Sequence, residues 1–579
     1  MDGEDAPERG APKACGISSP SRSKVTPASS PFPPQSPSPS LQGAGTAGPA
    51  VAARLAEDPA VTVLLIEAGP DNVNLENTHM VGGWSQNFDT EHDWNLVSEH
   101  NAAAANRTVK LSRGKFLGGS SAVNGTLMVR GAKQDYDDWE AMGNPGWGAD
   151  QMWYYFNKSE TFHIEDGFNE DISSHGKSGP IHTSIHPYAP ISNRVYESFM
   201  DRGFPLDDDM FATGTRSHGC GHCTKSVWKG MRMTGGEYIR SSFGDLKVVR
   251  HNNLSVAFNH QVARVILDKK NQIKGVEVIK NGTDKAITIK CQREVILSMG
   301  SYGSPQALLL SGIGPKEELY EVGVQPVVDL HGVGKNLEDH LTVFMFYEVS
   351  QGFTTDHLLH GDGVFERSRE EWRTQRAGTL SRSHFGAFAF TRLDEKLNKH
   401  EMWRKAPTEA GRDPLGLTPT QAQVEYFTTE RYAAPKHYNN PPPTGRSAFG
   451  LIVENFSAKI RGYVKLRSNN PLDKPIIQHN YLQDPLDVLV LAEACKYGAE
   501  IIHTCKMGPH SDPGAVVDSR LRVYGVKGLR VADCSIMPRL NNGHPQAVAY
   551  AIAEKCADMI KEDWKGVTNN SGRIVSSVL

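Results

Sequence analysis

The sequence predicts an α/β fold, α+β overall, in which a parallel sheet with a nucleotide-binding turn is joined to an antiparallel sheet. The first observation is a GxGxxG pattern at residues 43–48, which a helical pattern follows. The second is an apolar stretch at residues 61–66, typical of a buried strand, which ends at Glu67. The third is the alternation of apolar and polar residues at 423–427 and 463–466, typical of a half-buried antiparallel sheet.

The glycine-rich turn predicts a dinucleotide site. Its glycines let the backbone approach a pyrophosphate, and the free N–H groups of the following helix would bind the negative charge. Glu67, with Ala68 after it, falls about 20 residues further along at a strand end, where ribose recognition requires a carboxylate. The turn residues predicted to bind the ligand are Gly43, Gly45, Thr46, Ala47 and Gly48.

The segment before the turn does not look like a strand. A buried strand should precede a nucleotide-binding turn, but residues 29–39 are dense in proline, which central strands exclude. We therefore expect the first strand to be missing. Either the start of the gene is wrongly assigned, which is the favoured explanation, or the nucleotide site is damaged. Residues 1–40 are rich in Pro, Ser and charged residues and are predicted to be disordered, because they cannot bury enough apolar surface.

The composition argues against several functional classes. A formal charge of -4 and a pI of about 6.6 leave no basic face for nucleic acid. No apolar run approaches the roughly 18 residues that a membrane span needs. Eight cysteines in 579 residues do not make a disulfide scaffold. No apolar leader is recognisable, so a cytoplasmic location is the default expectation.

A second run of small residues, at 114–125, holds four glycines, two serines and an asparagine. Such a loop brings backbone and polar side chains close to a flat or charged ligand. A further Gly- and Ser-rich run spans residues 300–314. The two runs resemble the two signatures of the glucose-methanol-choline (GMC) family of flavin-dependent oxidoreductases. The similarity extends from about residue 43 to residue 564 and is nearest in character to the fungal aryl-alcohol oxidase-like branch.

The resemblance implies a Rossmann-like FAD-binding domain interleaved in sequence with a substrate-binding domain built on an antiparallel sheet. The FAD-binding domain would comprise residues 41–160, 230–335 and 500–579, and the substrate-binding domain residues 161–229 and 336–499. Relatives that bind flavin covalently through this loop carry histidine before the asparagine, whereas this chain carries Val123 before Asn124. Non-covalent FAD is therefore expected. Relatives are often secreted, so the location of this chain stays open.

Matching the family's motifs residue by residue extends the expected cofactor site beyond the first turn. Val262 matches a residue whose backbone meets adenine, and Asp533 matches a position against the ribityl chain. The cofactor-binding residues that the resemblance adds are Trp94, Gly118, Gly119, Ser120, Asn124, Gly125, Thr126, Leu127, Val262, Asp533, Pro545 and Gln546.

His544 aligns with the second member of the family's catalytic His/His or His/Asn pair. Imidazole titrates in the range needed to take the hydroxyl proton while hydride leaves the alcohol carbon. The first member is in doubt, because counting back from Thr504 places Glu500 at the histidine position. His503 would occupy the site only after local rearrangement, and the stretch before Thr504 is shorter than in relatives.

The resemblance thus implies an FAD-dependent oxidoreductase that oxidises an alcohol by hydride transfer to flavin N5, with oxygen or a quinone as acceptor. Aryl alcohols, sugars and alcohols of secondary metabolism are all candidate substrates. The alternative is a catalytically impaired flavin-binding pseudoenzyme, which Glu500 and the missing strand favour. A cyanohydrin lyase and an NAD(P) enzyme are weaker rivals. The His/Cys run at 218–223 resembles half of a zinc site without a second half, so no metal is expected.

Overall fold

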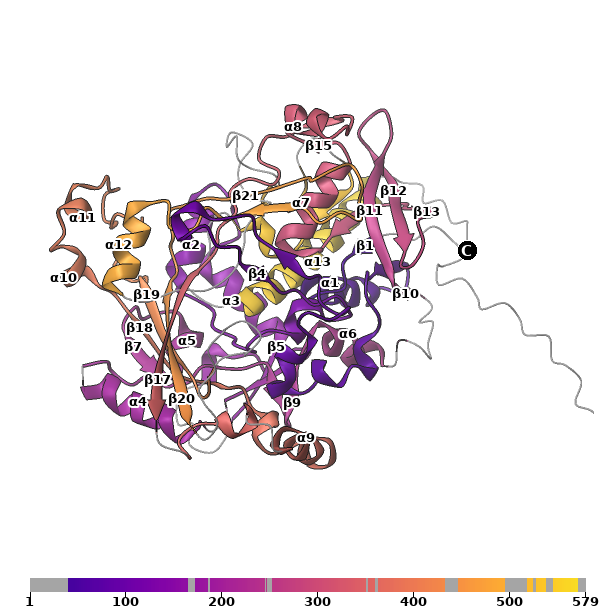
Figure 1. The fold of residues 1–579 in the computed structure, drawn as a ribbon. Helices are drawn as coiled ribbons and strands as arrows, with labels where there is room; N and C mark the ends of the chain where they lie inside the picture. Colours follow the sequence, from indigo (N-terminus) through magenta and orange to yellow (C-terminus); the bar gives the residue numbers. More distant parts are fainter. Residues whose placement is uncertain are drawn as a thin grey trace, which may run out of the picture.

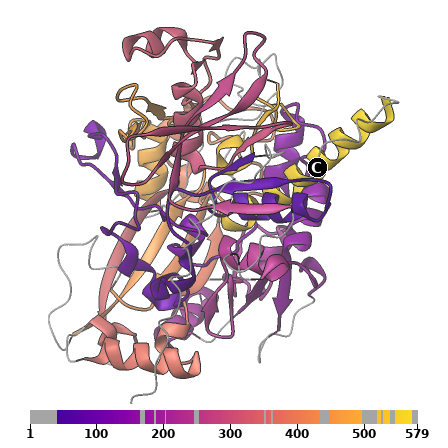
Figure 2. The same cartoon turned by 90° about the vertical axis from the view of Figure 1, so that its right-hand side faces the viewer.

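The computed structural model shows a molecule whose two halves each contain a five-stranded sheet, one parallel and one antiparallel (Figures 1 and 2). The expectation of a mixed α/β fold is therefore confirmed. The structure describes residues 40–164, 172–185, 188–201, 203–244, 246, 253–349, 352–359, 363–432, 446–494, 518–523, 527–537 and 545–570.

The parallel sheet has the order β10-β2-β1-β14-β23, and every neighbouring pair is parallel. In chain order its strands run third, second, first, fourth and fifth, so the direction of winding reverses between β1 and β14. Open α/β sheets bind their ligands outside the carboxyl ends of the strands at such a reversal. The strands are β1 (Ser40–Gln42), β2 (Val63–Ile66), β10 (Leu254–Ala257), β14 (Val295–Leu297) and β23 (Leu529–Val531).

The central strand β1 shows that the expectation of a missing first strand was wrong. Ser40, Leu41 and Gln42 are fully buried and pair with β2 on one side and with β14 on the other. A central strand here needs only three residues, and the prolines all precede Ser40 in the sequence, so they remove no hydrogen bond from this ladder. The prediction of disorder is therefore wrong at Ser40, the last residue of the predicted segment; residues 1–39 lie outside the described part of the chain.

Helices surround the parallel sheet. Helix α1 (Ala47–Ala56) is built almost entirely of small apolar residues, and all of its residues except Arg54 are buried, as expected for a helix without a broad polar face. It contacts α6 (Gly235–Phe243) and α13 (Pro545–Asn570). Arg54 on α1 donates to Glu554 on α13, with Nε 2.6 Å from Oε2. The far end of α13 projects from the molecule (yellow in Figure 2).

A smaller antiparallel sheet follows β10 along the chain and lies beside the parallel sheet (Figure 1). It consists of β11 (His260–Leu267), β12 (Ile273–Lys280) and β13 (Ala286–Lys290). Its register shifts between Val262 and Arg264. Strand β11 contacts α7 (Gly300–Leu310), the helix that the second signature forms.

The second large sheet is antiparallel throughout and has the order β17-β20-β19-β18-β7. The strand expected at 423–427 is its strand β19, whereas the one expected at 463–466 pairs only with β22 in a separate ribbon. The strands of the large sheet are β7 (Gly219–Gly221), β17 (Leu341–Val349), β18 (Phe385–Thr391), β19 (Val424–Thr429) and β20 (Ser447–Asn455).

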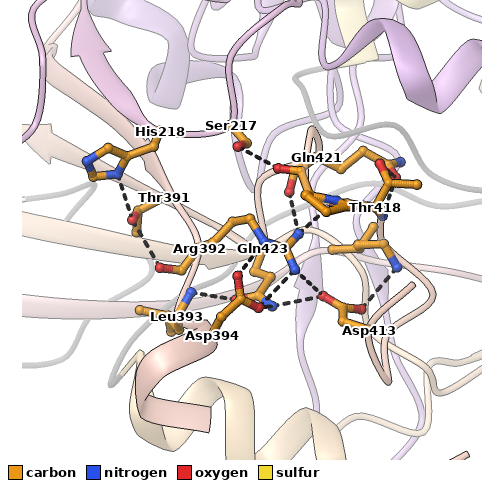
Figure 3. A network of polar contacts seen from close by, with 12 residues as sticks. Ser217, His218, Thr391, Arg392, Leu393, Asp394, Asp413, Thr418, Gln421 and Gln423 are labelled. Carbon is orange, nitrogen blue, oxygen red and sulfur yellow. Dashed lines mark hydrogen bonds and ion pairs between the residues drawn. The ribbon is translucent and has the colours of Figure 1, made fainter. Parts of the chain in front are cut away.

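A polar network holds the long connection between β18 and β19 (Figure 3). The guanidinium of Arg392 donates to Asp394 and Asp413 and to the carbonyl oxygens of Thr418 and Gln421, at 2.7–2.9 Å. Gln423, directly before β19, donates to the same two carboxylates. The two ends of the connection are therefore tied to each other beside the interior strands β18 and β19.

The remaining elements are short or lie between the two halves. Among the described residues, no helix is both long and apolar enough to cross a membrane. The further helices are α2 (Lys133–Ala141), α3 (Ala149–Ser159), α4 (Pro190–Asp201), α5 (Met210–Thr213), α8 (Lys316–Glu321), α9 (Val364–Gln375), α10 (Asp394–Leu397), α11 (Glu401–Lys405) and α12 (Pro485–Glu493). The further strands are β3 (Leu96–Val97), β4 (Lys110–Leu111), β5 (Glu160–His163), β6 (Ile181–Ser184), β8 (Val227–Trp228), β9 (Met231–Arg232), β15 (Ile313–Gly314), β16 (Val328–Asp329), β21 (Tyr463–Lys465) and β22 (Ile476–Gln478).

Candidate functional site

Four residues lie at or just beyond the carboxyl ends of the parallel strands, at one edge of the sheet. Gly43 follows β1, Glu67 follows β2, Ser298 follows β14 and Asp533 lies two residues after β23. These positions are far apart in the sequence. Because parallel strands end at a common edge, they form one candidate site.

The glycine-rich turn leaves open space at only one of its glycines. Gly43 has a φ of +94°, and a Cβ there would lie 2.4 Å from the carbonyl oxygen of Ser298. A Cβ on Gly48 would lie 2.0 Å from the carbonyl oxygen of Gly43, so Gly48 is required by packing. A Cβ on Gly45 would approach only the Cα of Gly119, at 4.0 Å. Gly45 therefore borders the space in which a pyrophosphate would fit.

Glu67 holds the turn in place. Its buried carboxylate accepts hydrogen bonds from the N–H of Ala44 at 2.9 Å and from the N–H of Gly69 at 2.8 Å. Burial raises the pKa of Glu67, although these N–H groups act in the opposite direction. The carbonyl of Glu67 accepts from the N–H of His260 at 2.9 Å, which places the start of β11, with Val262 two residues further, beside the same edge.

The loop of the first signature packs against the turn. The N–H of Gly118 donates to the carbonyl of Ala44 at 2.8 Å. Gly118 and Gly119 have φ values of +94° and +48°, and a Cβ on Gly119 would lie 2.7 Å from the Cα of Gly45. A side chain at either position would be strained or would collide. Ser120 follows in the same turn and is half-buried.

Asn124 connects this loop to the start of the last helix. Its Nδ2 donates to Oε1 of Gln546 at 2.8 Å, and the hydroxyl of Ser226 donates to the same oxygen at 3.1 Å. Arg232 is fully buried and donates from Nη1 to Oδ1 of Asn124 at 2.8 Å. Burial lowers the pKa of Arg232 to about 9. Sequence reasoning missed Arg232 and Ser226, because neither stands in a recognisable motif.

The next residues of the loop face the antiparallel sheet. The hydroxyl of Ser383 donates to the carbonyl of Gly125 at 3.1 Å, and a Cβ on Gly125 would lie 2.4 Å from the ring of Phe385. Thr126 has a φ of +69°, which is unfavourable for a β-branched residue and is typical of a functional loop. The backbones of Leu127 and Lys225 form an isolated antiparallel β-bridge.

Asp533 connects the last strand of the parallel sheet to the second signature. Its Oδ2 accepts from the N–H of Gly300 at 3.0 Å and from the hydroxyl of Ser304 at 2.7 Å. Both donors lie in the first turns of α7, where a carboxylate is stabilised by the helix dipole. Ser304 belongs to the second signature but was not predicted as a site residue.

The structure places some predicted residues away from these loops or leaves them undescribed. Trp94 is partly buried in a cluster with Tyr302, and the ammonium of Lys115 lies 5.1 Å from its ring centre. His503 and His544 lie outside the described residues, as does Glu500. For Pro545 only the backbone is described, at the start of α13.

Several buried polar atoms near the sheet edge have no hydrogen-bond partner within the described residues. They include Oγ of Ser298, Nε of Arg232 and both side-chain amide atoms of Asn72. A Cβ on Gly236, at the start of α6, would lie 3.1 Å from Oδ1 of Asn72. Buried polar groups are normally paired, so these atoms indicate a polar ligand at the site. A dinucleotide cofactor fits this set of open glycine, carboxylates and unpaired donors.

A cavity of about 290 Å³ adjoins the loop at Gly125. Ser383 and His384 line it, together with Glu430 and Arg431, which directly follow β19. The indole N–H of Trp84 donates to Nδ1 of His384 at 3.2 Å. Burial lowers the pKa of His384 well below its usual value, and the charges of Arg431, Arg232 and Lys225 act in the same direction. The cavity thus connects the first signature to the antiparallel sheet.

The His/Cys run at 218–223 forms part of β7 and the turn after it. Nδ1 of His218 is 3.0 Å from the hydroxyl of Thr391, and His222 stacks on Tyr188. Over the residues that the structure describes, no group of three or more His, Cys, Asp or Glu side chains is arranged to hold a metal ion.

Comparison with known proteins identifies the family. A model of the GMC oxidoreductase family matches residues 41–342, and a second one matches residues 502–553. Glucose dehydrogenase (FAD, quinone) of Drosophila pseudoobscura pseudoobscura is 32% identical, over 90% of this chain and 86% of that protein. Oxygen-dependent choline dehydrogenase of Brucella anthropi is 31% identical, over 90% of this chain and 94% of that protein.

Solved structures agree with this result. A formate oxidase of Aspergillus oryzae RIB40 superimposes with a TM-score of 0.82 at 28% identity, covering 92% of this chain and all of that one. A fungal aryl-alcohol oxidase shares the fold, with a TM-score of 0.72 at 24% identity over 92% of this chain and 99% of that one. The chain belongs to the GMC oxidoreductase family, whose members bind FAD and act on CH–OH groups.

Proposed function

We propose that this protein oxidises the CH–OH group of a small molecule, with FAD held non-covalently at the carboxyl edge of the parallel sheet. The observation that carries the proposal is the hydrogen bond between Asn124 and Gln546. It joins the flavin signature to the segment that directly follows His544, the residue aligned with a catalytic histidine. Two distant parts of the chain thereby meet at one place, as a hydride-transfer site requires.

Different described residues suit different parts of the cofactor. The N–H groups around Gly45 and at the start of α1 suit the pyrophosphate. Glu67 suits the ribose, and Asp533 suits the hydroxyl-bearing chain near α7. When bound, FAD supplies the hydride acceptor at flavin N5. Val123, in place of a histidine, supports non-covalent attachment.

Oxidation of an alcohol carbon breaks a C–H bond and an O–H bond and forms a carbonyl. The hydride carries both electrons, so the hydroxyl proton needs a separate base. We assign this role to His544, with His503 as the second basic group; both are proposals from the sequence. His384 lines the neighbouring cavity and is kept neutral by burial, so it can orient a substrate oxygen by hydrogen bonding.

The relatives do not determine the substrate or the acceptor. By their names, they act on a neutral sugar, on the choline cation and on the formate anion. One is named for a quinone and another for oxygen. The choice for this chain therefore has to come from its own cavity and from experiment.

The test is an absorption spectrum of the purified full chain between 300 and 550 nm, before and after anaerobic addition of a panel of alcohols. We expect flavin bands that bleach with at least one alcohol, and release of all flavin into the filtrate on denaturation. Return of the bands with oxygen, or only with a quinone, would identify the acceptor. His544→Gln should bind flavin and bleach slowly, by about 10²- to 10⁴-fold, whereas the exposed His100→Gln should behave like the wild type.

Two results would contradict the proposal. Flavin that stays bound but never bleaches with any alcohol would favour the impaired pseudoenzyme. Flavin that remains on the denatured chain would show covalent attachment.

A further inference from the structure

The cavity beside Gly125 is unusual in the charges that surround it. Lys225 is fully buried, and the only acceptor within hydrogen-bond distance of its Nζ among the described residues is the carbonyl of Cys223, at 3.3 Å. The same ammonium lies 5.2 Å from the ring centre of Tyr188, which lines the cavity. An ammonium buried among rings and a carbonyl is costly without a counter-ion.

Arg431, on the cavity wall, is a second buried cation with few acceptors among the described residues. It is 6% exposed, and its Nη2 lies 3.4 Å from the carbonyl oxygen of Gly82, a long hydrogen bond. Burial lowers the pKa of Arg431 to about 10. Arg382, which is exposed at the rim, adds a further cation to the lining.

The carboxylates nearby are already occupied by neutral donors. Oε1 of Glu430 accepts from the N–H of Ala189 at 2.6 Å and from the hydroxyl of Ser192 at 2.8 Å. The buried Asp356 accepts from the N–H groups of Tyr432 at 2.7 Å and Ala448 at 2.6 Å, and from the hydroxyl of Thr354.

The cations around the cavity therefore outnumber the carboxylates. Lys225 and Arg382 interact with Glu430, and Arg431 interacts with Asp356. Arg232 lies behind them and interacts with Glu237, so four cations face three carboxylates in the described interior. Glu371, beside Gly378 at the rim, is exposed to solvent, which screens its charge. The surplus positive charge lies in a partly enclosed space, where the low effective dielectric strengthens its attraction for an anion.

His384 adds a directed donor to this surplus. An indole N–H can only donate, so Nδ1 of His384 must be the acceptor of the bond from Trp84 and carries no proton. The ring is neutral, so its proton is on Nε2. A cavity-lining imidazole N–H beside two guanidinium groups is a donor set for an oxyanion.

We propose that this cavity binds the carboxylate of an anionic substrate, so that the CH–OH compound oxidised by this protein is a hydroxy acid. The inference rests on the proposed function and narrows it to a substrate class. Arg431 and His384 would contact the carboxylate, and Lys225 and Arg382 would favour it through charge. A cation of the choline type would be repelled by the same groups, and a neutral alcohol would leave them uncompensated.

The first experiment compares three alcohols of one shape in anaerobic bleaching and in steady-state kinetics. They are 4-(hydroxymethyl)benzoate, its neutral methyl ester and the cationic 4-(aminomethyl)benzyl alcohol. All three are para-substituted benzyl alcohols, and they differ in the charge of the para substituent. We expect the acid to have a kcat/KM at least about tenfold above that of the ester, since one hydrogen-bonded charge pair contributes about that factor. The cationic alcohol should be the poorest of the three.

The second experiment removes one cation at a time. Arg431→Gln should raise KM for the acid by about tenfold or more and leave the ester nearly unchanged. Arg382 is exposed, so Arg382→Gln removes no packed volume. It therefore tests the preference for the acid if Arg431→Gln fails to fold. Arg194→Gln is the matched control, because Arg194 is exposed on α4 and pairs with Glu197 at the surface. It should leave all three alcohols unaffected.

A binding measurement separates this proposal from the proposed function. Calorimetric titration of the holoprotein with benzoate should show binding that Arg431→Gln or Arg382→Gln weakens, whereas neutral benzamide should bind poorly. If benzoate binds in this way while no alcohol bleaches the flavin, the anion site stands and the proposed oxidation fails. If alcohols are oxidised but the ester equals the acid, or benzamide binds as well as benzoate, the anion site is overturned.

Discussion

Replacing Gly45 and Gly48 separately by alanine tests which glycines serve the ligand and which serve the fold. The methyl group of Gly48→Ala would lie 2.0 Å from the carbonyl oxygen of Gly43, so α1 or the turn must move. Such overpacking costs about 1–3 kcal/mol. The methyl group of Gly45→Ala would meet protein only at 4.0 Å, and Gly45 has no positive φ, so the fold should tolerate it.

The two variants should therefore separate stability from affinity. Gly45→Ala should keep the melting temperature of the apoprotein, because alanine at a compatible glycine position is neutral or stabilising by about 0.4–1 kcal/mol. Its methyl group would displace the pyrophosphate from one or two N–H groups, which corresponds to about 10- to 100-fold weaker FAD binding. Gly48→Ala should lower the melting temperature first.

The assay is FAD titration of the apoprotein by fluorescence quenching, with the melting temperature measured in parallel. Wild-type affinity in Gly45→Ala would refute the assignment of this space to the cofactor. An unchanged melting temperature in Gly48→Ala would refute the packing argument.

Three further predictions concern buried polar groups. Burial alone would raise the pKa of Glu160, but His175 and Arg130 outweigh it and hold that pKa at about 2, while the pKa of His175 is raised. Because the stability from a raised histidine pKa is complete below about pH 6.5 and is lost as pH rises through the folded pKa, the deficit in melting temperature of His175→Gln should be largest in mild acid and shrink at alkaline pH. The double variant Ser40→Val/Gln42→Val should raise the melting temperature by about 1–3 °C, since Oε1 of Gln42 is buried and has no hydrogen-bond partner among the residues that the structure describes. Glu67→Gln should lower that of the apoprotein by about 2–3 °C, because an amide offers one acceptor to two N–H donors.

Matched surface variants serve as controls for these measurements. His100→Gln and Glu321→Gln change exposed side chains and should follow the wild type at every pH. A pH-independent deficit in His175→Gln would contradict the assigned ion pairs. A lower melting temperature in Ser40→Val/Gln42→Val would show that Ser40 and Gln42 stabilise β1. An unchanged melting temperature in Glu67→Gln would contradict the role of Glu67 in holding the turn.

The glycine spacing was sufficient to predict the turn and the helix after it, because close backbone approach excludes other side chains at Gly43 and Gly48. The same local reasoning failed for β1. A strand of three residues, two of them polar, carries no periodic signal that can be read from the sequence. It forms because β2 and β14 supply hydrogen-bond partners on both sides.

The glycine-rich loops proposed to hold the cofactor could be located from the sequence, since their signatures are contiguous and each depends on local backbone requirements. Arg232, Ser226 and Ser383 could not, because they reach the loop at residues 124–126 only through tertiary packing. Their residue types are common, and nothing local distinguishes them.

The sequence by itself determined the family, the α/β class and the glycine-rich turns, because these depend on motifs whose residues act on their own backbone. Only the tertiary structure decided the charge of the cavity. Lys225, Arg382 and Arg431 come from separate parts of the chain, and each looks like an ordinary surface cation in the sequence. Their joint effect exists because the antiparallel sheet packs against the loop at Gly125 and encloses two of them, away from the water that would otherwise screen their charge.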